Sequence, residues 1–328
     1  MTENRSTARR ERFSELLKDA HLNQWWFAFT TVTVTVLVAF VLWYTHLPSY
    51  LEHYPVRWWF FVGAVLIIPL QFVGYAMALR NASTNHLGFG PVLALEVGES
   101  VTAMATPESV GSFALSMRFL KRAGLDTTSS VAAVGLASFV TSMVAVIVLP
   151  IAVILAASTI NYSQLKSDVP SGMWEIILGV IAVAVFVTVL IKAPTVRQRV
   201  MKSLHSGGEY LRQVIREPRR SLLIGSAELV TLIGEVGALS LLVLGVRQHA
   251  NIPALIVIVL VASTASSVVP IPGGLGAPEA ILVAGLASLG VEHKAALIAA
   301  VSYRLLSYWI PPLPGLVCLR WLAHTDRL

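Results

Sequence analysis

Ionisable residues lie inside stretches of this sequence that are apolar enough to cross a membrane. Arg304 stands about ten residues into an apolar run, and Glu228 and Glu235 stand seven residues apart in another. An ionised side chain at the bilayer centre costs about 2.5 to 3.5 kcal/mol on insertion scales, so each one requires a partner, a ligand or a proton. The spacing of the two glutamates, close to two helical turns, predicts that they share one helix face.

Two accounts of these charges stay open. In the first, Arg304 neutralises one or two glutamates and holds helices together. In the second, Arg304 receives a phosphate through its planar guanidinium, while glutamates meet a cationic group or a proton. Both can hold at once, because carboxylates in or beside the apolar sequence outnumber this one arginine. They are Glu96, Glu99, Glu108, Glu228, Glu235 and Glu279.

One short phrase occurs twice, 165 residues apart. Residues 107–112 (PESVGS) and 272–277 (PGGLGA) share a proline, an aliphatic residue, a glycine and a small residue in the same order. Each phrase interrupts an apolar region, 91–122 or 252–289, and the halves of the first are too short to cross a bilayer comfortably. We interpret each region as a re-entrant or bent helical hairpin. The break residues at the two tips are Pro107, Gly111, Pro272 and Gly276.

The second break has the chemistry of an anion site. Gly273 and Gly274 leave backbone N–H groups accessible, and a helix that starts after such a break directs the positive end of its dipole at the site. A Pro-Gly-Gly stretch is also an ordinary kink or turn. Its twin in the other half of the chain favours the functional interpretation.

The composition indicates the class of protein. Of 328 residues, 55% are hydrophobic and 13% are charged, and the mean hydropathy is +0.72. These values are typical of a polytopic membrane protein. The single cysteine, Cys318, excludes an internal disulfide, and the histidines fall in expected termini, loops or helix ends. We therefore expect no metal site and no cofactor.

Six apolar runs have the roughly 20 residues that a spanning helix needs. We expect an all-α polytopic membrane protein in which six spanning helices and the two broken hairpins form one membrane domain, residues 25–322. The six runs cover residues 25–45, 58–79, 129–157, 172–192, 222–245 and 294–321.

Lysine and arginine indicate the orientation of the chain. The segment 193–220 and the amphipathic N-terminal segment 1–24 are both basic, so the positive-inside bias places them in the cytoplasm. The tail 323–328 follows on the same side. We therefore expect a multi-pass protein of the plasma (inner) membrane with both termini cytoplasmic. The net charge of +6 reflects this cytoplasmic excess and requires no nucleic-acid partner.

This orientation makes the two copies inverted. The hairpin 91–122 starts and ends on the cytoplasmic side, whereas the hairpin 252–289 starts and ends outside. Each repeat, about 58–157 and about 222–321, then contains a spanning helix, a hairpin and a second spanning helix. Inverted repeats whose broken helices meet near the midplane form a site that opens to either face. A duplication that is retained only for folding is the alternative.

Three stretches carry a resemblance to a known family. They are residues 269–280 (VPIPGGLGAPEA) and 301–311 (VSYRLLSYWIP) in the second half, and residues 113–124 (FALSMRFLKRAG) in the first. Together they are similar to the lysylphosphatidylglycerol synthase transmembrane-region family, over roughly 58–321. The first break departs from the pattern, because many members have an Arg and a Glu where this chain has Glu108, Ser109 and Ser112. The matching positions are Pro272, Gly273, Gly274, Gly276, Glu279 and Arg304.

The resemblance implies a role in moving or handling phosphate-bearing lipids. The family includes the flippase portion of the multiple peptide resistance factor and relatives linked to lipid-carried sugars. Synthesis of lysylphosphatidylglycerol is not expected, because aminoacyl transfer in that family resides in an appended soluble domain that this sequence does not contain. The leading hypothesis is a lipid translocase for a headgroup such as a polyprenyl-phosphate-linked sugar or an aminoacyl phospholipid.

The hypothesis describes a transporter rather than an enzyme, with anionic or phosphate-bearing membrane lipids as partners. A membrane-embedded transferase, or an accessory subunit that presents lipid to such a transferase, is the main alternative. A structural scaffold explains the basic loop but not the buried acids, and a homo-oligomer stays open. The expected substrate-binding residues are Glu108, Glu228, Glu235, Gly273, Gly274, Glu279, Tyr303, Arg304 and Tyr308.

Overall fold

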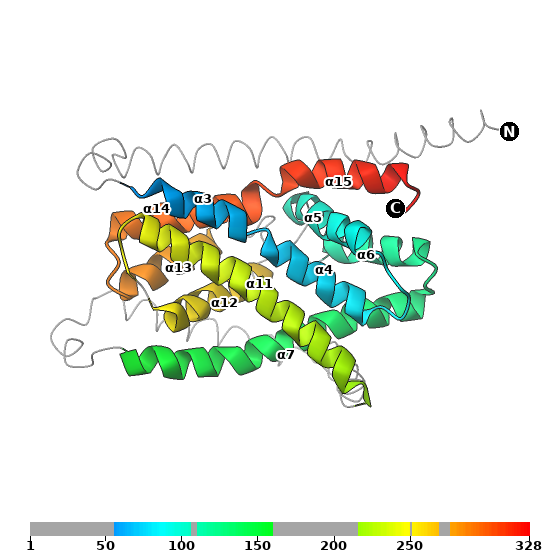
Figure 1. Ribbon diagram of the computed structural model, residues 1–328, viewed down its shortest axis with the longest axis horizontal. Coiled ribbons are helices and arrows are strands. Elements are labelled where there is room, and N and C mark those ends of the chain that lie inside the picture. Colours follow the sequence, from blue (N-terminus) through cyan, green and yellow to red (C-terminus); the bar gives the residue numbers. More distant parts are fainter. Residues whose placement is uncertain (1–55, 106–109, 160–215, 250, 269–275) are drawn as a thin grey trace, which may run out of the picture.

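The computed structural model describes residues 56–105, 110–159, 216–249, 251–268 and 276–328 (Figure 1). Every regular element in these ranges is a helix, as the sequence predicts. The expected spans 25–45 and 172–192, the N-terminal segment 1–24 and most of the basic segment 193–220 lie outside the described residues.

Three helical stretches are long and apolar enough to cross a membrane. They confirm helices at the runs 58–79, 129–157 and 222–245. The first stretch is divided near Pro69, whose ring removes one backbone N–H from the helical ladder. The helices of the three stretches are α3 (Trp58–Ile67), α4 (Leu70–Ala82), α7 (Thr127–Thr159) and α11 (Pro218–Gly245).

The helices α4 and α11 pack unusually closely along much of their length. A Cβ atom added at Gly74 of α4 would lie 2.1 Å from Oγ1 of Thr231 and 2.6 Å from the carbonyl oxygen of Ala227. A Cβ atom at Gly234 of α11 would lie 2.8 Å from the backbone nitrogen of Gln71. Small residues allow such contact between backbones, which is how helices associate where lipid removes the hydrophobic drive.

Each of the two interrupted apolar regions forms a pair of helices that pack against each other. The segments that contain the breaks, 106–109 and 269–275, lie outside the described residues, so the re-entrant character of the hairpins stays a prediction. The first pair is α5 (Phe89–Ala105) and α6 (Val110–Arg122), and the second pair is α12 (Ile252–Val268) and α13 (Ala277–Ser288).

The expected single helix at 294–321 is divided in the structure. The backbone N–H of Ile310 donates to the carbonyl of Leu305, five residues earlier, at 2.8 Å, which is the hydrogen bond of a π-helix. Pro311 and Pro312 follow at once and supply no backbone N–H, so the α-helical ladder cannot continue through this turn. The resulting elements are α14 (His293–Arg304), the π-helix η2 (Leu305–Trp309) and α15 (Pro312–His324).

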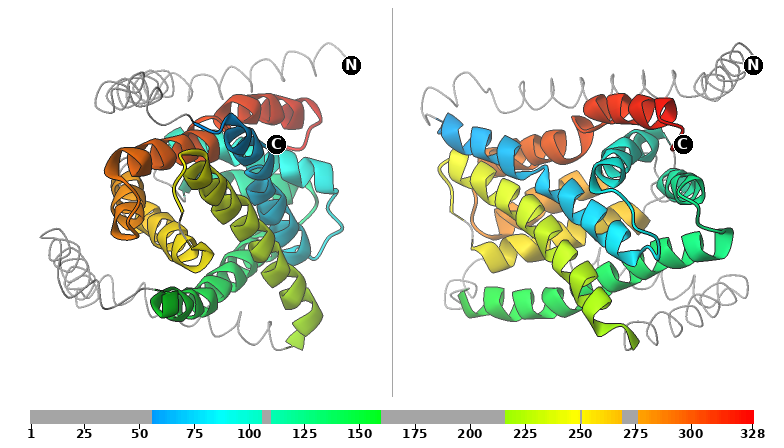
Figure 2. Two further views of the ribbon diagram at one scale, coloured as in Figure 1. Left: turned by 60° about the vertical axis from the view of Figure 1, so that its left-hand side comes forward. Right: turned by 45° about the vertical axis from the view of Figure 1, so that its right-hand side comes forward.

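Each hairpin contacts the last helix of the other half of the chain. The helix α5 packs against α15, and α12 packs against α7 (Figures 1 and 2). At the first contact, a Cβ atom at Gly315 would lie 2.6 Å from the carbonyl oxygen of Val97. A core of buried leucines, including Leu239, Leu282 and Leu286, lies between the helices of the second half.

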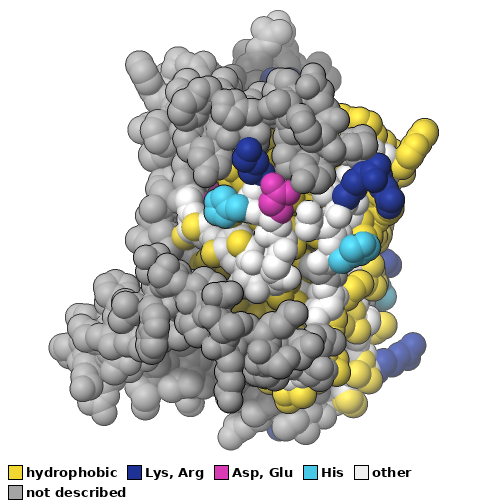
Figure 3. Space-filling model, turned by 90° about the vertical axis from the view of Figure 1, so that its left-hand side faces the viewer, with side chains coloured by type: hydrophobic (Ala, Val, Ile, Leu, Met, Phe, Trp, Pro, Cys, Tyr) yellow, Lys and Arg dark blue, Asp and Glu magenta, His cyan; other side chains and the backbone are white. Residues whose placement is uncertain are grey.

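Apolar side chains cover much of the outer surface. Val146 and Ile154 on α7 are 72% and 69% exposed, which suits a helix that faces lipid rather than water. Figure 3 shows the end of the molecule where α11 finishes and α14 begins. A few basic, acidic and histidine side chains gather there between apolar ones, as expected for helix ends that reach a membrane surface.

Candidate functional site

The centre of the site is a buried ion pair between Arg304 and Glu279. Nε of Arg304, the last residue of α14, lies 2.7 Å from Oε1 of Glu279 in the first turn of α13. The two residues are 7% and 8% exposed. The other carboxylate oxygen, Oε2, accepts a hydrogen bond from the backbone N–H of Gly276 at 2.8 Å. Glu279 thus fixes the start of α13 and neutralises the arginine with one side chain.

The backbone at Gly276 explains why this helix starts where it does. Gly276 has a φ of +92°, a conformation that a residue with a Cβ atom rarely adopts. The turn directs its N–H at Glu279, so the glycine of the repeated phrase has a defined structural role. Gly111 lies within the described residues, whereas the remaining residues expected at the breaks do not: Pro107, Glu108, Pro272, Gly273 and Gly274. The anion site at the Gly-Gly pair therefore stays a prediction.

Glu279 uses only one edge of the Arg304 guanidinium. Nη2 of Arg304 is buried and has no hydrogen-bond partner among the residues that the structure describes. The aromatic ring of Tyr308 lies 4.4 Å from the guanidinium carbon and covers one face of the group. A buried donor without a partner costs about 1 to 3 kcal/mol. The guanidinium therefore keeps a desolvated donor available to an oxygen acceptor.

A second buried donor lies in the same turn of the chain. Nε1 of Trp309 is buried and, within the described ranges, has no hydrogen-bond partner. The rings of Trp309 and Tyr308 meet edge to face with centroids 5.4 Å apart, so Tyr308 contacts both Arg304 and Trp309. Trp309 is not among the site residues that the sequence predicts. Its one signal was its place within the motif 301–311, five residues after Arg304.

Two hydrogen bonds connect this turn to the first half of the chain. The hydroxyl of Tyr308 donates to the carbonyl oxygen of Ala103, near the end of α5, at 3.2 Å. The side-chain amide of Gln71 in α4 donates to the carbonyl oxygen of Ser307 at 3.2 Å. Tyr308 was an expected site residue, whereas Gln71 was not, because a lone glutamine in an apolar helix carries no distinctive spacing.

The two glutamates of α11 do not pair with Arg304, and one of them has a hydroxyl partner on α4. The hydroxyl of Tyr75 in α4 donates to Oε1 of Glu235 at 3.1 Å, and Glu235 is buried. Glu228 is half-buried and lies seven residues, or about two helical turns, before Glu235 on the same helix. Tyr303, an expected site residue on α14, is buried within the hydrophobic core of the second half. The structure therefore pairs Arg304 with Glu279 and gives Glu235 a hydroxyl partner instead.

The first hairpin has its own carboxylate contact, which is partly buried. The hydroxyl of Ser116 in α6 donates to Oε1 of Glu99 in α5, which joins the two helices of the pair. Glu96 lies one turn earlier on α5 and is half-buried. Gly111 stands in the first turn of α6. Within the described residues, no group of three or more His, Cys, Asp and Glu side chains is arranged to hold a metal ion.

The family model described as "Lysylphosphatidylglycerol synthase TM region" matches residues 30–315, which is most of the sequence. The chain belongs to this family. A curated relative, "Inner membrane protein YbhN" of Escherichia coli (strain K12), is 37% identical over 83 residues. That alignment covers 25% of this chain and 26% of the relative, so it spans about a quarter of either protein. The protein is therefore a membrane protein of the lysylphosphatidylglycerol synthase TM-region family.

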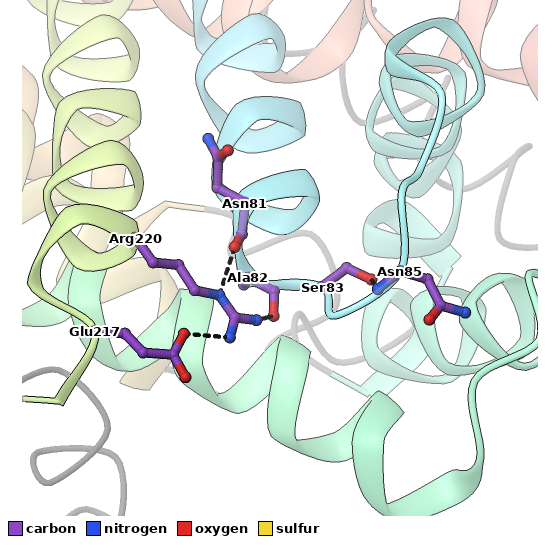
Figure 4. Close-up of polar contacts among 6 residues, drawn as sticks. All are labelled: Asn81, Ala82, Ser83, Asn85, Glu217 and Arg220. Atoms are coloured by element: carbon purple, nitrogen blue, oxygen red, sulfur yellow. Dashed lines mark hydrogen bonds and ion pairs between the residues drawn. The ribbon is translucent and has the colours of Figure 1, made fainter.

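This member of the family has a second arginine between helices, and its surroundings are different (Figure 4). Nε of Arg220 donates to the carbonyl of Asn81 at 2.7 Å, and Nη2 donates to the carbonyl of Ala82. Nη1 lies 2.9 Å from Oε2 of Glu217. The carbonyls belong to the last turn of α4, where no helical N–H remains to bind them. Arg220 thus caps one helix from the start of another.

Proposed function

We propose that this protein is a lipid translocase of the plasma membrane that handles a phosphate-bearing headgroup. The headgroup passes between the two halves of the bundle while the acyl or prenyl tails stay in lipid. A polyprenyl-phosphate-linked sugar or an aminoacyl phospholipid has the required chemistry. One observation carries the proposal: Arg304 is buried, and Nη2 has no partner among the described residues although Nε is paired with Glu279.

A phosphate oxygen suits this arrangement for three reasons. The planar guanidinium offers several N–H donors in fixed directions, and phosphate accepts them in pairs. The site is desolvated, which strengthens any charged hydrogen bond that forms there. The start of α13 lies beside Arg304 through Glu279, and the positive end of a helix dipole favours an added anion. The indole N–H of Trp309 is a second buried donor for the same headgroup.

The packing of the helices supports an inverted-repeat mechanism. If residues 58–157 and 222–321 are equivalent, then α4 corresponds to α11, α5 to α12, and α7 to α14 with α15. Each contact then has a counterpart in the other repeat. The helix α5 packs against α15 as α12 packs against α7, and the equivalent helices α4 and α11 pack against each other. Two such halves rocking against each other open a central site to either face. In this proposal both termini are cytoplasmic, and the hairpins enter the membrane and return.

Glu228 and Glu235 complete the proposal as acidic residues on the path. Their helix, α11, packs against both α4 and α14, so it borders the two halves. A carboxylate at this depth needs a proton or a cationic group to offset its burial. An aminoacyl headgroup carries such a cation, and a coupling proton is the other candidate for this role.

The test is a headgroup-accessibility assay in proteoliposomes. The panel contains labelled phosphatidylglycerol, lysylphosphatidylglycerol, a polyprenyl-phosphate sugar and, as control, a neutral glycolipid without phosphate. We expect the protein to move at least one phosphate-bearing lipid and not the neutral glycolipid. Arg304→Lys keeps the charge but loses the planar donors, so transport should fall at least tenfold with little change in thermal stability.

The matched control for this variant is Arg220→Lys. It makes the same chemical change at the arginine that caps α4, where we expect transport per folded molecule to be retained. Wild-type transport by a well-folded Arg304→Lys protein would remove the phosphate site from the proposal. Failure of the wild-type protein to move any lipid of the panel would overturn the translocase itself.

A further inference from the structure

Prolines leave two backbone carbonyls near Arg304 without their usual helical donors. In an α-helix, the carbonyl of residue i accepts a hydrogen bond from the N–H of residue i+4. Residue 311 is a proline, so the carbonyl of Ser307 has no such donor, and Pro312 removes the i+5 donor as well. Residue 107 is also a proline, so the carbonyl of Ala103 loses its i+4 donor in the same way.

Each of these carbonyls accepts a hydrogen bond from a side chain in the other half of the chain. Gln71, in the first half, donates to Ser307 at 3.2 Å. Tyr308, in the second half, donates to Ala103 at 3.2 Å. Buried backbone carbonyls are almost always paired in proteins. The side chains of Gln71 and Tyr308 supply the hydrogen-bond donors that the prolines lack. The two bonds cross between the halves at the turn that follows Arg304.

Gln71 is held firmly enough to act as a fixed reference for this turn. Its backbone N–H donates to the carbonyl of Ile68 at 3.1 Å, at the junction of α3 and α4. The helix α11 approaches so closely that a Cβ atom at Gly234 would lie 2.8 Å from the Gln71 nitrogen. The Gln71 residue is only 4% exposed. Its amide therefore meets Ser307 from a position that two helices determine.

The turn that Gln71 binds is the one that arranges the site. Arg304 precedes the π-helix η2, and Tyr308 and Trp309 lie within it. The ring of Tyr308, four residues after Arg304, covers the guanidinium from within this turn. π-helical turns are rare, and they are frequently found at functional sites. The wide turn persists here because Pro311 prevents the α-helical bond and Gln71 binds the carbonyl instead.

We infer that Gln71 is a positioning residue for the phosphate site: through the carbonyl of Ser307 it holds in place the wide turn that carries Tyr308 and Trp309 beside Arg304. This inference rests on the proposed function for the role of Arg304. Gln71 does not touch the headgroup. Its effect on transport passes through the shape of η2, and small displacements of a binding group have large effects on the process it serves.

Two variants test the inference from opposite directions. Gln71→Met removes the donor and keeps a long apolar side chain, so the Ser307 carbonyl loses its partner and the turn loosens. Pro311→Ala restores a backbone N–H that can bind the same carbonyl within the helix, so the turn narrows toward α-helical geometry. We expect each variant to reduce transport roughly tenfold, while Pro311→Ala keeps or raises the midpoint of thermal unfolding. A merely structural role of Gln71 predicts full transport by Pro311→Ala.

Hydrogen exchange of the segment 305–310 supplies a readout that does not depend on transport. Exchange should rise in Gln71→Met, because the turn has lost the bond that holds it. The matched control is Asn85→Ala, which removes another side-chain amide that donates to a helix-end carbonyl, that of Ala123 at 3.3 Å. The control should leave both exchange at 305–310 and transport unchanged.

The outcomes separate this inference from the proposed function. If Arg304→Lys abolishes transport while Gln71→Met or Pro311→Ala transports normally, the positioning role is wrong and the phosphate site survives. If Arg304→Lys transports normally, the phosphate site is wrong whatever Gln71 does. Unchanged exchange at 305–310 in Gln71→Met overturns the inference even if the wild-type protein moves none of the lipids in the panel.

Discussion

The turns around Arg304 and Arg220 both place a guanidinium between helices, yet they differ in what the nitrogens bind. At Arg220, Nε, Nη1 and Nη2 each donate to an oxygen, two of them carbonyls at the end of α4. At Arg304, Nε binds Glu279, whereas Nη2 has no partner in the described part of the chain. A guanidinium that lies between helices therefore does not by itself identify a ligand site. The proposed phosphate site rests instead on Nη2 of Arg304, which has no partner among the described residues.

The two arginines also differ in the end of the helix that they contact. Arg220 meets carbonyl oxygens at the C-terminal end of α4, where a cation is favourable without any further anion. Arg304 is joined through Glu279 to the N-terminal end of α13. The positive end of the helix dipole there disfavours a cation and stabilises an anion. Glu279 supplies one negative charge at this end of α13, and the proposed headgroup would add a second at Nη2. Substitutions at the two arginines and at Glu279 test this difference.

The largest effect is expected from alanine at the two arginines. Arg304→Ala leaves Glu279 as a buried carboxylate without its cation and should reduce the free energy of unfolding by about 3 to 5 kcal/mol. Arg220→Ala leaves carbonyls at a helix end that water can reach, and should cost about 1 to 3 kcal/mol. Thermal and denaturant unfolding in detergent measure both. Equal decreases in the free energy of unfolding would mean that the two arginines stabilise the fold to the same extent.

The next effect concerns the carboxylate of Glu279. Glu279→Gln keeps an oxygen for the N–H of Gly276 but removes the charge that neutralises Arg304. The variant should unfold at a lower temperature than wild type, and phosphate-bearing lipid should restore more of its stability, since a ligand that binds only the folded state stabilises it. A neutral glycolipid is the control. The same lipid response in variant and wild type would contradict an anion site at Arg304.

Much of the fold could be predicted from sequence because hydrophobicity and length determine it. The helices at 58–82, 127–159 and 218–245 follow from apolar runs of sufficient length, and the two helix pairs follow from the interruptions at 106–109 and 269–275. The division of 294–321 at η2 did not follow. Proline indicated a kink there, but the width of the turn depends on which carbonyl finds a donor elsewhere in the structure, and sequence spacing contains no such information.

The candidate site was predictable where charge alone identified it. Arg304 and Glu279 were singled out because ionised groups are expensive in a bilayer, yet their pairing with each other was one of several open choices. Gln71 and Trp309 were missed because neutral polar side chains carry a small cost that composition cannot reveal. Their roles depend on contacts between segments more than 200 residues apart, such as that of Gln71 with Ser307. Only the packed helices bring these groups together.

A smaller effect is expected at the acids outside the arginine pair. Glu235→Gln keeps an oxygen that accepts the hydroxyl of Tyr75, so the folded yield should hold, while transport should fall if the carboxylate meets a proton or a cation. Glu217→Gln is the matched control, because Glu217 is exposed and pairs with Arg220 at the surface. Loss of folded protein in Glu235→Gln would favour a structural role for this glutamate.

The smallest effect is expected from removing the second unpaired donor. Trp309→Phe deletes the indole N–H, which has no partner among the described residues, at the expense of some ring volume. The two changes oppose each other, so the unfolding temperature should change little. Transport should fall by a few-fold if the N–H donates to the headgroup, in keeping with roughly 1 kcal/mol for one neutral hydrogen bond. The control is Trp321→Phe, at an exposed tryptophan of α15. A stable Trp309→Phe protein with full transport would assign the headgroup to Arg304 alone. The difference between the turns around Arg304 and Arg220 would then be the single donor Nη2 of Arg304.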